Sequence, residues 1–209
     1  YQFKSRTFSS KKISAKQLAK AVDKKTTGIC YFGGDPTPQI LHAVKASKIA
    51  VKNAGGRILR ICWETNGAVR EPFLTMMADL SLTSGGCIKF DLKAWDEGIH
   101  LALCGVTNSK TLENFRTLSE WVEQRPNPPL LIASTLLVPG YVDESEVSSI
   151  ARFISDLNPK IPYSLLAFYP QFYLNDLPTT SRSHALRCRT VAEEAGLENV
   201  HVGNVHLLV

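Results

Sequence analysis

The sequence lacks three features, each of which would point directly to a class of protein. Its five cysteines include no pair with Cys-x-x-Cys spacing, which excludes a zinc knuckle and a thioredoxin-like redox motif. Its longest apolar run, residues 130–138, is too short to cross a bilayer as a helix, so we expect no membrane partner. Long basic runs are also absent. The scattered lysines and arginines behind the net charge of +5 favour a solvated basic surface over a nucleic-acid groove.

The composition is that of one ordinary globular domain. Hydrophobic residues make up 44% of the 209 residues, which is enough to bury one full core, and no linker-like segment divides the chain. We therefore interpret residues 1–209 as a single domain. The odd number of cysteines and the lack of a secretory signal indicate a reducing compartment, the cytoplasm.

A repeated pattern of apolar, β-prone runs dominates the sequence. Each run ends in glycine or polar residues, and a helical stretch follows each of the first five; the runs are residues 28–32, 57–63, 86–90, 130–138, 163–168 and 200–202. Strand, polar loop and helix in alternation predict an α/β fold, a partial (β/α) TIM-like barrel with parallel strands and outer helices. We expect Asn108 to cap a helix, and residues 95–100 and 171–175 to form variable loops. In such barrels the loops after the strands build the active site.

Two of these junctions carry groups suited to a small polar ligand. Gly33 and Gly34 leave the backbone bare where it leaves a strand, and Asp35 follows as an acceptor for a cation. A plain turn would have the same composition. Thr65 and Asn66 add a hydroxyl and an amide at the end of the next strand.

A third junction carries two opposite charges. Asp91 and Lys93 stand two residues apart in an extended segment, so both side chains project to one face. They could pair with each other as a purely structural ion pair. The polar loops that flank them favour a zwitterionic ligand held by both charges.

The ordered set of these segments resembles the radical S-adenosylmethionine (SAM) enzymes. The matching segments are Gly-Gly-Asp-Pro at 33–36, Glu-Thr-Asn-Gly at 64–67, Asp-Leu-Lys at 91–93, Leu-Leu-Val-Pro-Gly at 136–140, and residues 103–114 and 195–204. The likeness is greatest to the pyruvate formate-lyase activating enzymes, and the last segment resembles activating-enzyme-like members of the AmmeMemoRadiSam system. The resemblance covers nearly the whole chain.

The resemblance implies a SAM site at the strand ends. Gly33, Gly34 and Asp35 match a Gly-Gly-Glu segment that holds the methionyl amino group, although Asp35 is one methylene shorter than the usual glutamate. Lys93 matches a residue suited to the carboxylate of SAM. Thr65 and Asn66 match a segment near the cofactor, and Asp91 matches a residue that contacts SAM. In activating enzymes, Glu64, Thr65 and Asp91 would also correspond to a monovalent cation site.

Two departures from the family reduce what can be carried over. Tyr169 falls where relatives often carry a histidine near the ribose, and it cannot act as an imidazole. More importantly, the family holds a [4Fe–4S] cluster with a Cys-x-x-x-Cys-x-x-Cys loop, and that spacing is absent here. Because residues 1–3, Tyr-Gln-Phe, fit the residues just past that loop, we expect the three cysteines upstream of Tyr1. The chain would then be a fragment that lacks the first strand and binds no cluster.

The function implied is reductive cleavage of SAM at the cluster to a 5′-deoxyadenosyl radical that abstracts hydrogen. The substrate would be a glycyl-radical enzyme, another protein or a small molecule, and flavodoxin or ferredoxin would donate the electron. No residue of the chain is singled out as catalytic.

Two alternatives remain open. Lys93 could form a Schiff base in an aldolase-like lyase, but the neighbouring Asp91 favours its charged ammonium. The chain could also be a non-catalytic remnant without a cluster that binds a nucleotide or a protein partner.

Overall fold

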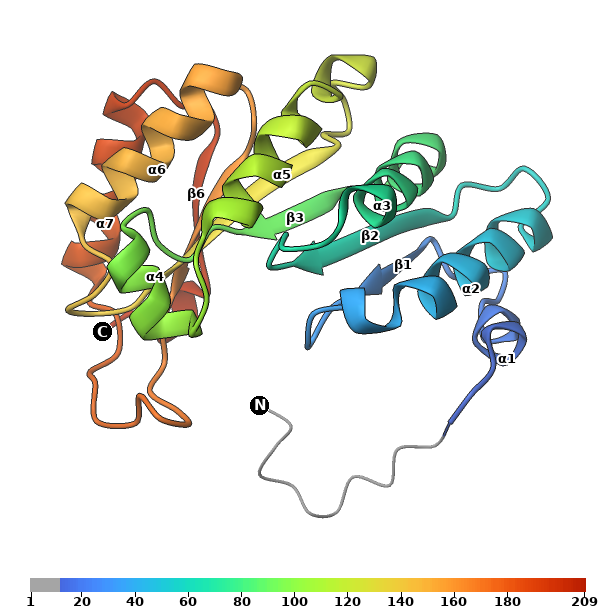
Figure 1. Cartoon of the computed structure of the whole chain (residues 1–209), viewed down its shortest axis with the longest axis horizontal. Coiled ribbons are helices and arrows are strands. Elements are labelled where there is room, and N and C mark those ends of the chain that lie inside the picture. The colour runs from blue at the N-terminus through green and yellow to red at the C-terminus, as the bar shows by residue number, and fades with distance from the viewer. Residues whose placement is uncertain (1–11) are drawn as a thin grey trace.

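A computed structural model describes residues 12–209, and the segment at residues 1–3 lies outside that range. The chain forms one sheet of six parallel strands in sequence order, so each strand pairs with the next along the chain (Figure 1). The strands are β1 (Gly28–Tyr31), β2 (Arg60–Thr65), β3 (Ile88–Asp91), β4 (Leu131–Leu137), β5 (Tyr163–Ala167) and β6 (Val200–Gly203). This topology confirms the predicted α/β fold of parallel strands with outer helices.

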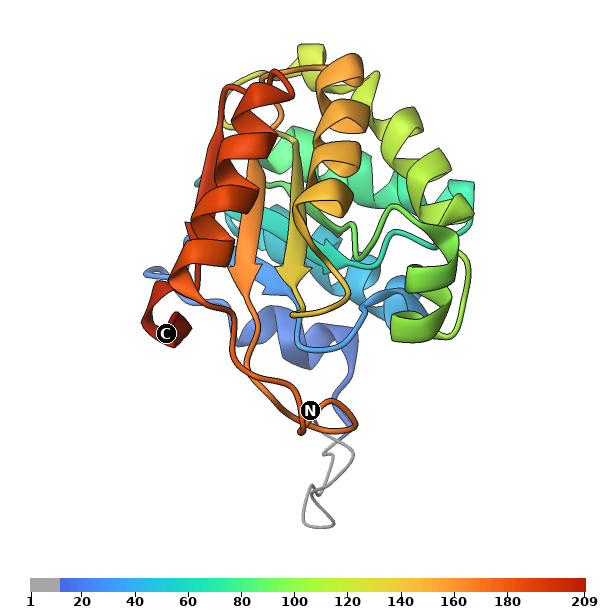
Figure 2. The ribbon, with the colours of Figure 1, turned by 90° about the vertical axis from the view of Figure 1, so that its left-hand side faces the viewer.

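The described part of the chain has seven α-helices, of which α1 precedes β1 and the other six lie in the connections between strands. They are α1 (Ala15–Lys20), α2 (Ile40–Asn53), α3 (Glu71–Ser84), α4 (Glu97–Cys104), α5 (Ser109–Ser119), α6 (Glu144–Leu157) and α7 (Arg182–Glu194). Figure 2 shows α6 and α7 side by side in front of the strands. None of the helices in residues 12–209 has both the length and the apolar character needed to span a membrane.

One local prediction was wrong in the segment around α4. Residues 95–100, expected as a loop, include the start of α4, where the side chain of Asp96 accepts a hydrogen bond from the backbone amide of Ile99 at 2.9 Å. Asn108 occupies the N-cap position of α5, as predicted, but its side chain makes no capping hydrogen bond. Its amide instead donates to the carbonyls of Ala94 and Trp95, at 3.1 and 2.7 Å, and so fastens α5 to the chain before α4.

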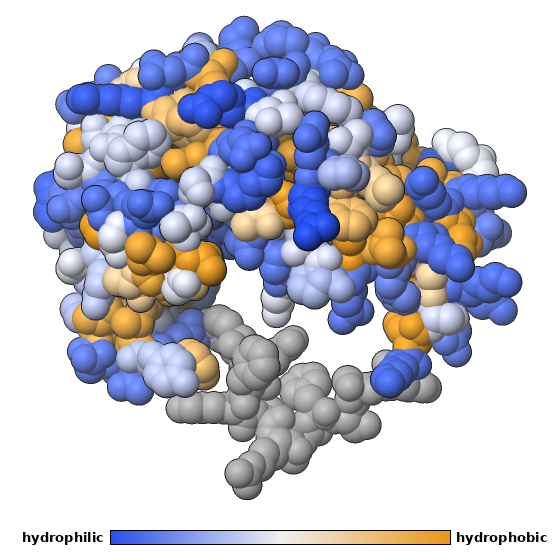
Figure 3. Space-filling model, in the orientation of Figure 1, coloured by the Kyte–Doolittle hydropathy of each residue, from blue (hydrophilic) through white to orange (hydrophobic). Residues whose placement is uncertain are grey.

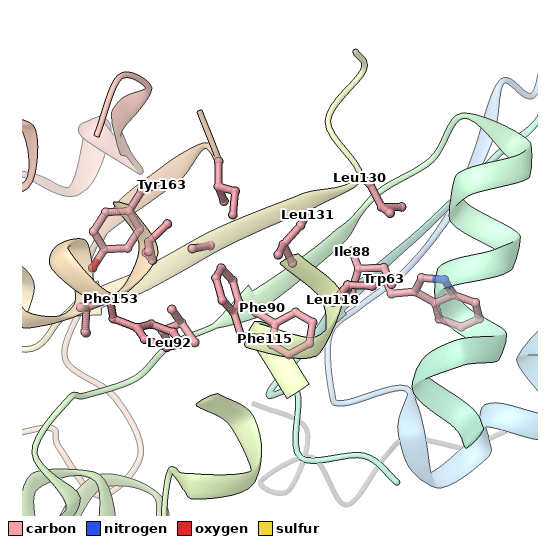
Figure 4. Close-up of a cluster of buried hydrophobic side chains, with 14 of the residues drawn as sticks. Trp63, Ile88, Phe90, Leu92, Phe115, Leu118, Leu130, Leu131, Phe153 and Tyr163 are labelled. Atoms are coloured by element: carbon pink, nitrogen blue, oxygen red, sulfur yellow. The ribbon is translucent and has the colours of Figure 1, made fainter. Parts of the chain in front are cut away.

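The two faces of the sheet differ in burial. On the first, which we call the helix-covered face, the residues pack under the helices and form the core; Figure 4 shows part of it, and its strand residues include Ile61, Trp63, Ile88, Phe90, Leu131, Tyr163 and Leu165. On the second, the open face, the alternate residues are half-buried or exposed; they include Cys30, Cys62, Glu64, Cys87, Lys89, Asp91, Ile132, Leu136, Ser164, Leu166 and His201.

The outer surface of the helices is mixed in character. In the view of Figure 3, hydrophilic residues predominate, and hydrophobic residues gather in the region of α4. Leu101 and Val106 are among the exposed hydrophobic residues there. A few exposed hydrophobic residues are usual on a protein surface and do not by themselves indicate a site.

Candidate functional site

The predicted site residues lie at one edge of the sheet. Because all six strands are parallel, their carboxyl ends meet at that edge. Gly33, Gly34 and Asp35 follow β1, Thr65 ends β2 and Asn66 follows it, Asp91 ends β3 and Lys93 follows it, and Tyr169 comes just after β5. The structure therefore brings the predicted loops to a common side, as ligand sites in parallel α/β proteins require.

Asp35 ties the ends of β1 and β2 together. One carboxylate oxygen accepts hydrogen bonds from the Thr65 hydroxyl and from the backbone N–H of Asn66, at 2.8 and 2.7 Å. The other accepts from the Thr37 amide at 2.9 Å. A carboxylate has about four acceptor positions, so three are used within the protein. This arrangement makes Asp35 first of all a residue that positions the two loops.

The backbone at Gly33 and Gly34 is open to a ligand. Gly33 has φ of +88°, a conformation that other residues rarely adopt. A Cβ atom built on either glycine would meet no atom within 4 Å. A cavity of about 510 Å³ opens beside both glycines and is lined also by Phe32, Asp35 and His42. The peptide groups of this turn can therefore be approached directly by a ligand.

Side chains of α5 hold the loop after β2 by hydrogen bonds to its backbone carbonyls. Asn114, which is buried, donates to the carbonyls of Gly67 and Val69 at 2.6 and 2.7 Å. Thr111 donates to the Asn66 carbonyl at 2.7 Å. Gly67 has φ of +74°, and a Cβ there would lie 2.3 Å from the ring of Phe90. Sequence reasoning missed Asn114 and Thr111, because nothing local marks a helix residue as the anchor of a loop some 45 residues earlier.

Asp91 and Lys93 point to the same face, as their spacing predicts. The Lys93 ammonium lies 2.7 Å from one oxygen of Asp91. The Ser134 hydroxyl on β4 donates to the other oxygen at 2.8 Å. About a third of the Lys93 side chain is exposed (32%), so its ammonium can still reach a second anion. The structural ion pair, which the sequence analysis gave as the alternative to a bound zwitterion, is thus present, together with a serine that the sequence did not reveal.

The residues of the expected cation site already have protein partners. Glu64 pairs with Lys89 at 3.1 Å, and Asp91 pairs with Lys93. Glu64 and Thr65 are consecutive in β2, so their side chains project to opposite faces. A monovalent cation near Glu64, Thr65 and Asp91 remains a prediction. The same holds for Tyr169, whose side chain is largely exposed at the end of β5.

The thiols of the open face have an unusual electrostatic environment. The pKa of Cys62 is lowered to about 6, chiefly by a hydrogen bond with the Cys87 thiol, with Arg60 and Arg125 also favouring the thiolate and burial opposing it. The same hydrogen bond, and then burial, raise the pKa of Cys87. The two thiols and the two arginines together thus favour ionisation of one thiol of this pair.

The described residues do not fit an iron–sulfur cluster. Within residues 12–209, no three histidine, cysteine or acidic side chains converge as a group that could hold a metal ion. Three thiolates from one loop are what a cluster of this family requires. The open turn at Gly33 and Gly34 and the Lys93 ammonium lie at the same carboxyl edge of the sheet. A backbone carbonyl and a lysine are groups to which an ammonium and a carboxylate can bind, and a zwitterionic ligand such as the amino-acid part of SAM carries both.

Comparisons with known proteins bear on the chain as a whole. No protein-family model matches the chain. The isethionate sulfite-lyase activating enzyme of Desulfovibrio desulfuricans is 34% identical over 144 residues, 68% of this chain and 42% of that protein, so the chain spans less than half of that relative's length.

Two solved structures show the fold. A domain of pyruvate-formate lyase-activating enzyme from Bacteroides vulgatus has a TM-score of 0.65 at 22% identity and covers 85% of this chain and 99% of the domain. A radical SAM methyltransferase from Sphaerobacter thermophilus has a TM-score of 0.67 at 18% identity and covers 90% of this chain and 53% of that protein.

Proposed function

Because the chain is a relative of the radical SAM activating enzymes, we propose that it is the SAM-binding part of such an enzyme. The observation that carries the proposal is the convergence of an open Gly33–Gly34 backbone and the Lys93 ammonium at the carboxyl edge of one parallel sheet. A zwitterionic amino acid moiety needs both a carbonyl-rich turn for its ammonium and a cation for its carboxylate.

In this proposal the residues of the chain bind and orient SAM. The carbonyls of Gly33 and Gly34 accept from the amino group, and the remaining acceptor position of Asp35 adds to them. Lys93 binds the carboxylate, while Asp91 and Ser134 hold the lysine in place. When bound at a cluster, SAM supplies the 5′-deoxyadenosyl group that abstracts hydrogen, and the protein contributes position and a water-poor surrounding.

The cluster itself has no fitting ligands among residues 12–209. A [4Fe–4S] cluster in the intact protein, reduced by flavodoxin or ferredoxin, is part of the proposal.

The proposed substrate is a protein. The relative with 34% identity is named as the activating enzyme of a sulfite-lyase. A relative from Methanocaldococcus jannaschii, 33% identical over 81 residues, is named "Putative glycyl-radical enzyme activating enzyme", and this name supports a glycyl-radical enzyme as the partner of the intact protein. The competing role of Lys93 as a Schiff-base nucleophile is disfavoured by its 2.7 Å ion pair with Asp91, since a nucleophilic lysine must be uncharged.

The test is SAM binding by calorimetry with two matched lysine variants. Lys93→Ala should weaken binding by about 1–3 kcal/mol, the loss expected for a charged hydrogen-bond partner. Lys110→Ala is the control, because Lys110 also pairs with a carboxylate, Glu113 at 2.9 Å, but on the outer surface of α5. Equal SAM affinities of the two variants would contradict the proposed site.

A further inference from the structure

Three cysteines lie side by side on the open face. Cys30 of β1 is in register with Cys62 of β2. The pairing of Trp63 with Ile88 places Cys62 beside Cys87, and the Trp63 amide donates to the Cys87 carbonyl at 3.0 Å. Since side chains alternate along a strand, all three thiols project away from the helices. None of them takes part in the site at the strand ends.

The register of β2 and β3 sets the side chains of Cys62 and Cys87 next to each other on the open face. Paired strands lie about 4.8 Å apart, which is within the range of about 4.4–6.8 Å between the Cα atoms of a disulfide. Gly86 permits this approach, because a Cβ there would lie 1.9 Å from the carbonyl oxygen of Ile61. Cys30 is the other neighbour of Cys62. We choose Cys87 as its partner because the guanidinium of Arg125, which binds the carbonyl of Gly86, lies on that side of Cys62.

Two cationic side chains lie near this pair. Arg60 is two residues before Cys62 in β2 and shares its face. The guanidinium of Arg125 donates to the carbonyl of Gly86, next to Cys87, and to that of Ser81 at 3.3 Å. Both arginines lie close enough to act on the charge of Cys62. Positive charge beside a partly accessible thiol is the usual setting of a reactive cysteine.

We propose that Cys62 and Cys87 form a redox-active dithiol that reacts with low-molecular-weight disulfides. The Cys62 thiolate attacks one sulfur of the small disulfide, the sulfur–sulfur bond breaks, and one small thiolate leaves and takes up a proton. Cys87 then loses its proton to solvent and attacks the Cys62 sulfur, which expels the second small thiolate. Two protein thiols are oxidised to one disulfide, and the small disulfide is reduced to two thiols.

The product would join β2 and β3 across the open face. The carboxyl ends of these two strands carry Thr65 and Asp91 of the candidate SAM site. Oxidation would therefore fix the spacing of two strands below that site. The proposal does not depend on SAM binding, because it rests on strand register and on the placement of Arg125.

The test uses the reduced protein and oxidised glutathione, followed by tryptic mapping without reduction. Trypsin places the three thiols in separate peptides, residues 26–45, 61–70 and 71–89. We expect peptide 61–70 linked to peptide 71–89 as the main product. A main link between 26–45 and 61–70 would overturn the choice of partner. Glutathione on Cys104, which is exposed, with Cys62 and Cys87 still reduced would overturn the proposal as a whole.

Variants separate the attacking thiol from the resolving thiol. In Cys87→Ala, glutathione should remain on Cys62 as a stable mixed disulfide. In Cys62→Ala, Cys87 should react no faster than Cys104. Cys30→Ala is the matched control and should form the bond at the rate of the unaltered protein. A mixed disulfide that accumulates on Cys87 in place of Cys62 would reverse the roles and contradict the mechanism. If a variant fails to fold, the peptide map of the unaltered protein still tests the proposal.

Discussion

Each central strand of the sheet presents one face to the helices and the other away from them, and the two faces differ in composition. In β2, Ile61 and Trp63 are buried under the helices, whereas Cys62 and Glu64 between and after them are only half-buried. In β3, Phe90 is fully buried and Lys89 is not. The helix-covered face carries the stability of the domain, and the open face carries its ionisable and nucleophilic groups.

The largest expected effect is a difference in the free energy of unfolding between two isoleucine variants, one on each face of the sheet. Ile88 in β3 is fully buried on the helix-covered face, and Ile132 in β4 is half-buried on the open face. Ile88→Ala should lower the free energy of unfolding by about 2–5 kcal/mol, because it leaves a cavity in the core. Ile132→Ala should cost about 1 kcal/mol, since less apolar surface returns to water. Urea unfolding measures both, and equal losses would show that the open face is packed like a core.

The next largest effect on stability concerns the loop after β2, at the carboxyl edge of the sheet. Gly67→Ala combines a left-handed backbone with a contact of 2.3 Å to the Phe90 ring, so it should cost about 2–4 kcal/mol. Gly140→Ala, at φ of +79° with no atom near its Cβ, carries the backbone penalty alone, about 1–2 kcal/mol. Thermal unfolding of both variants checks the difference. Equal costs for the two variants would show that the Phe90 ring moves away from the added Cβ without penalty.

A smaller effect tests the thiols of the open face. Alkylation of Cys62 by iodoacetamide should rise with pH around a midpoint of about 6, because only the thiolate reacts. Cys87 should react only in alkaline solution, since its pKa is raised. Cys87→Ala removes the hydrogen bond that lowers the pKa of Cys62, so the midpoint should move to higher pH and labelling near pH 6 should slow by about tenfold. Peptide 61–70 reports the rate by mass spectrometry. A midpoint near the ordinary thiol value of about 8.5 would refute the environment described.

Much of this comparison could be predicted from sequence, because the signals are local. Alternation of apolar and polar residues fixed the strands and the pairing of Asp91 with Lys93 on one face. The predicted run at 130–138 differs from β4 by one residue at each end. The bare Gly33 and Gly34 turn could be read from composition alone.

What the sequence could not supply depends on contacts between distant segments. The neighbourhood of Cys30, Cys62 and Cys87 is set by strand register, which no single strand encodes. Asn108 was expected to cap a helix, but its amide bonds carbonyls 13 and 14 residues earlier. The start of α4 is fixed in part by Glu146, whose carboxylate accepts from the Trp95 amide at 2.6 Å. The roles expected for Tyr169 and for a cation near Glu64 remain predictions.

The most direct test of the central claim is to locate SAM on the protein by amide chemical shifts. In ¹H–¹⁵N spectra, titration with SAM should shift the amides of Gly33, Gly34 and Asn66 at the carboxyl edge of the sheet. The amides of Arg189 and His201 should stay unchanged, although a cavity of about 520 Å³ lies beside them between α7 and β6. Shifts at that second cavity, with none at Gly33 and Gly34, would contradict the assignment of the SAM site.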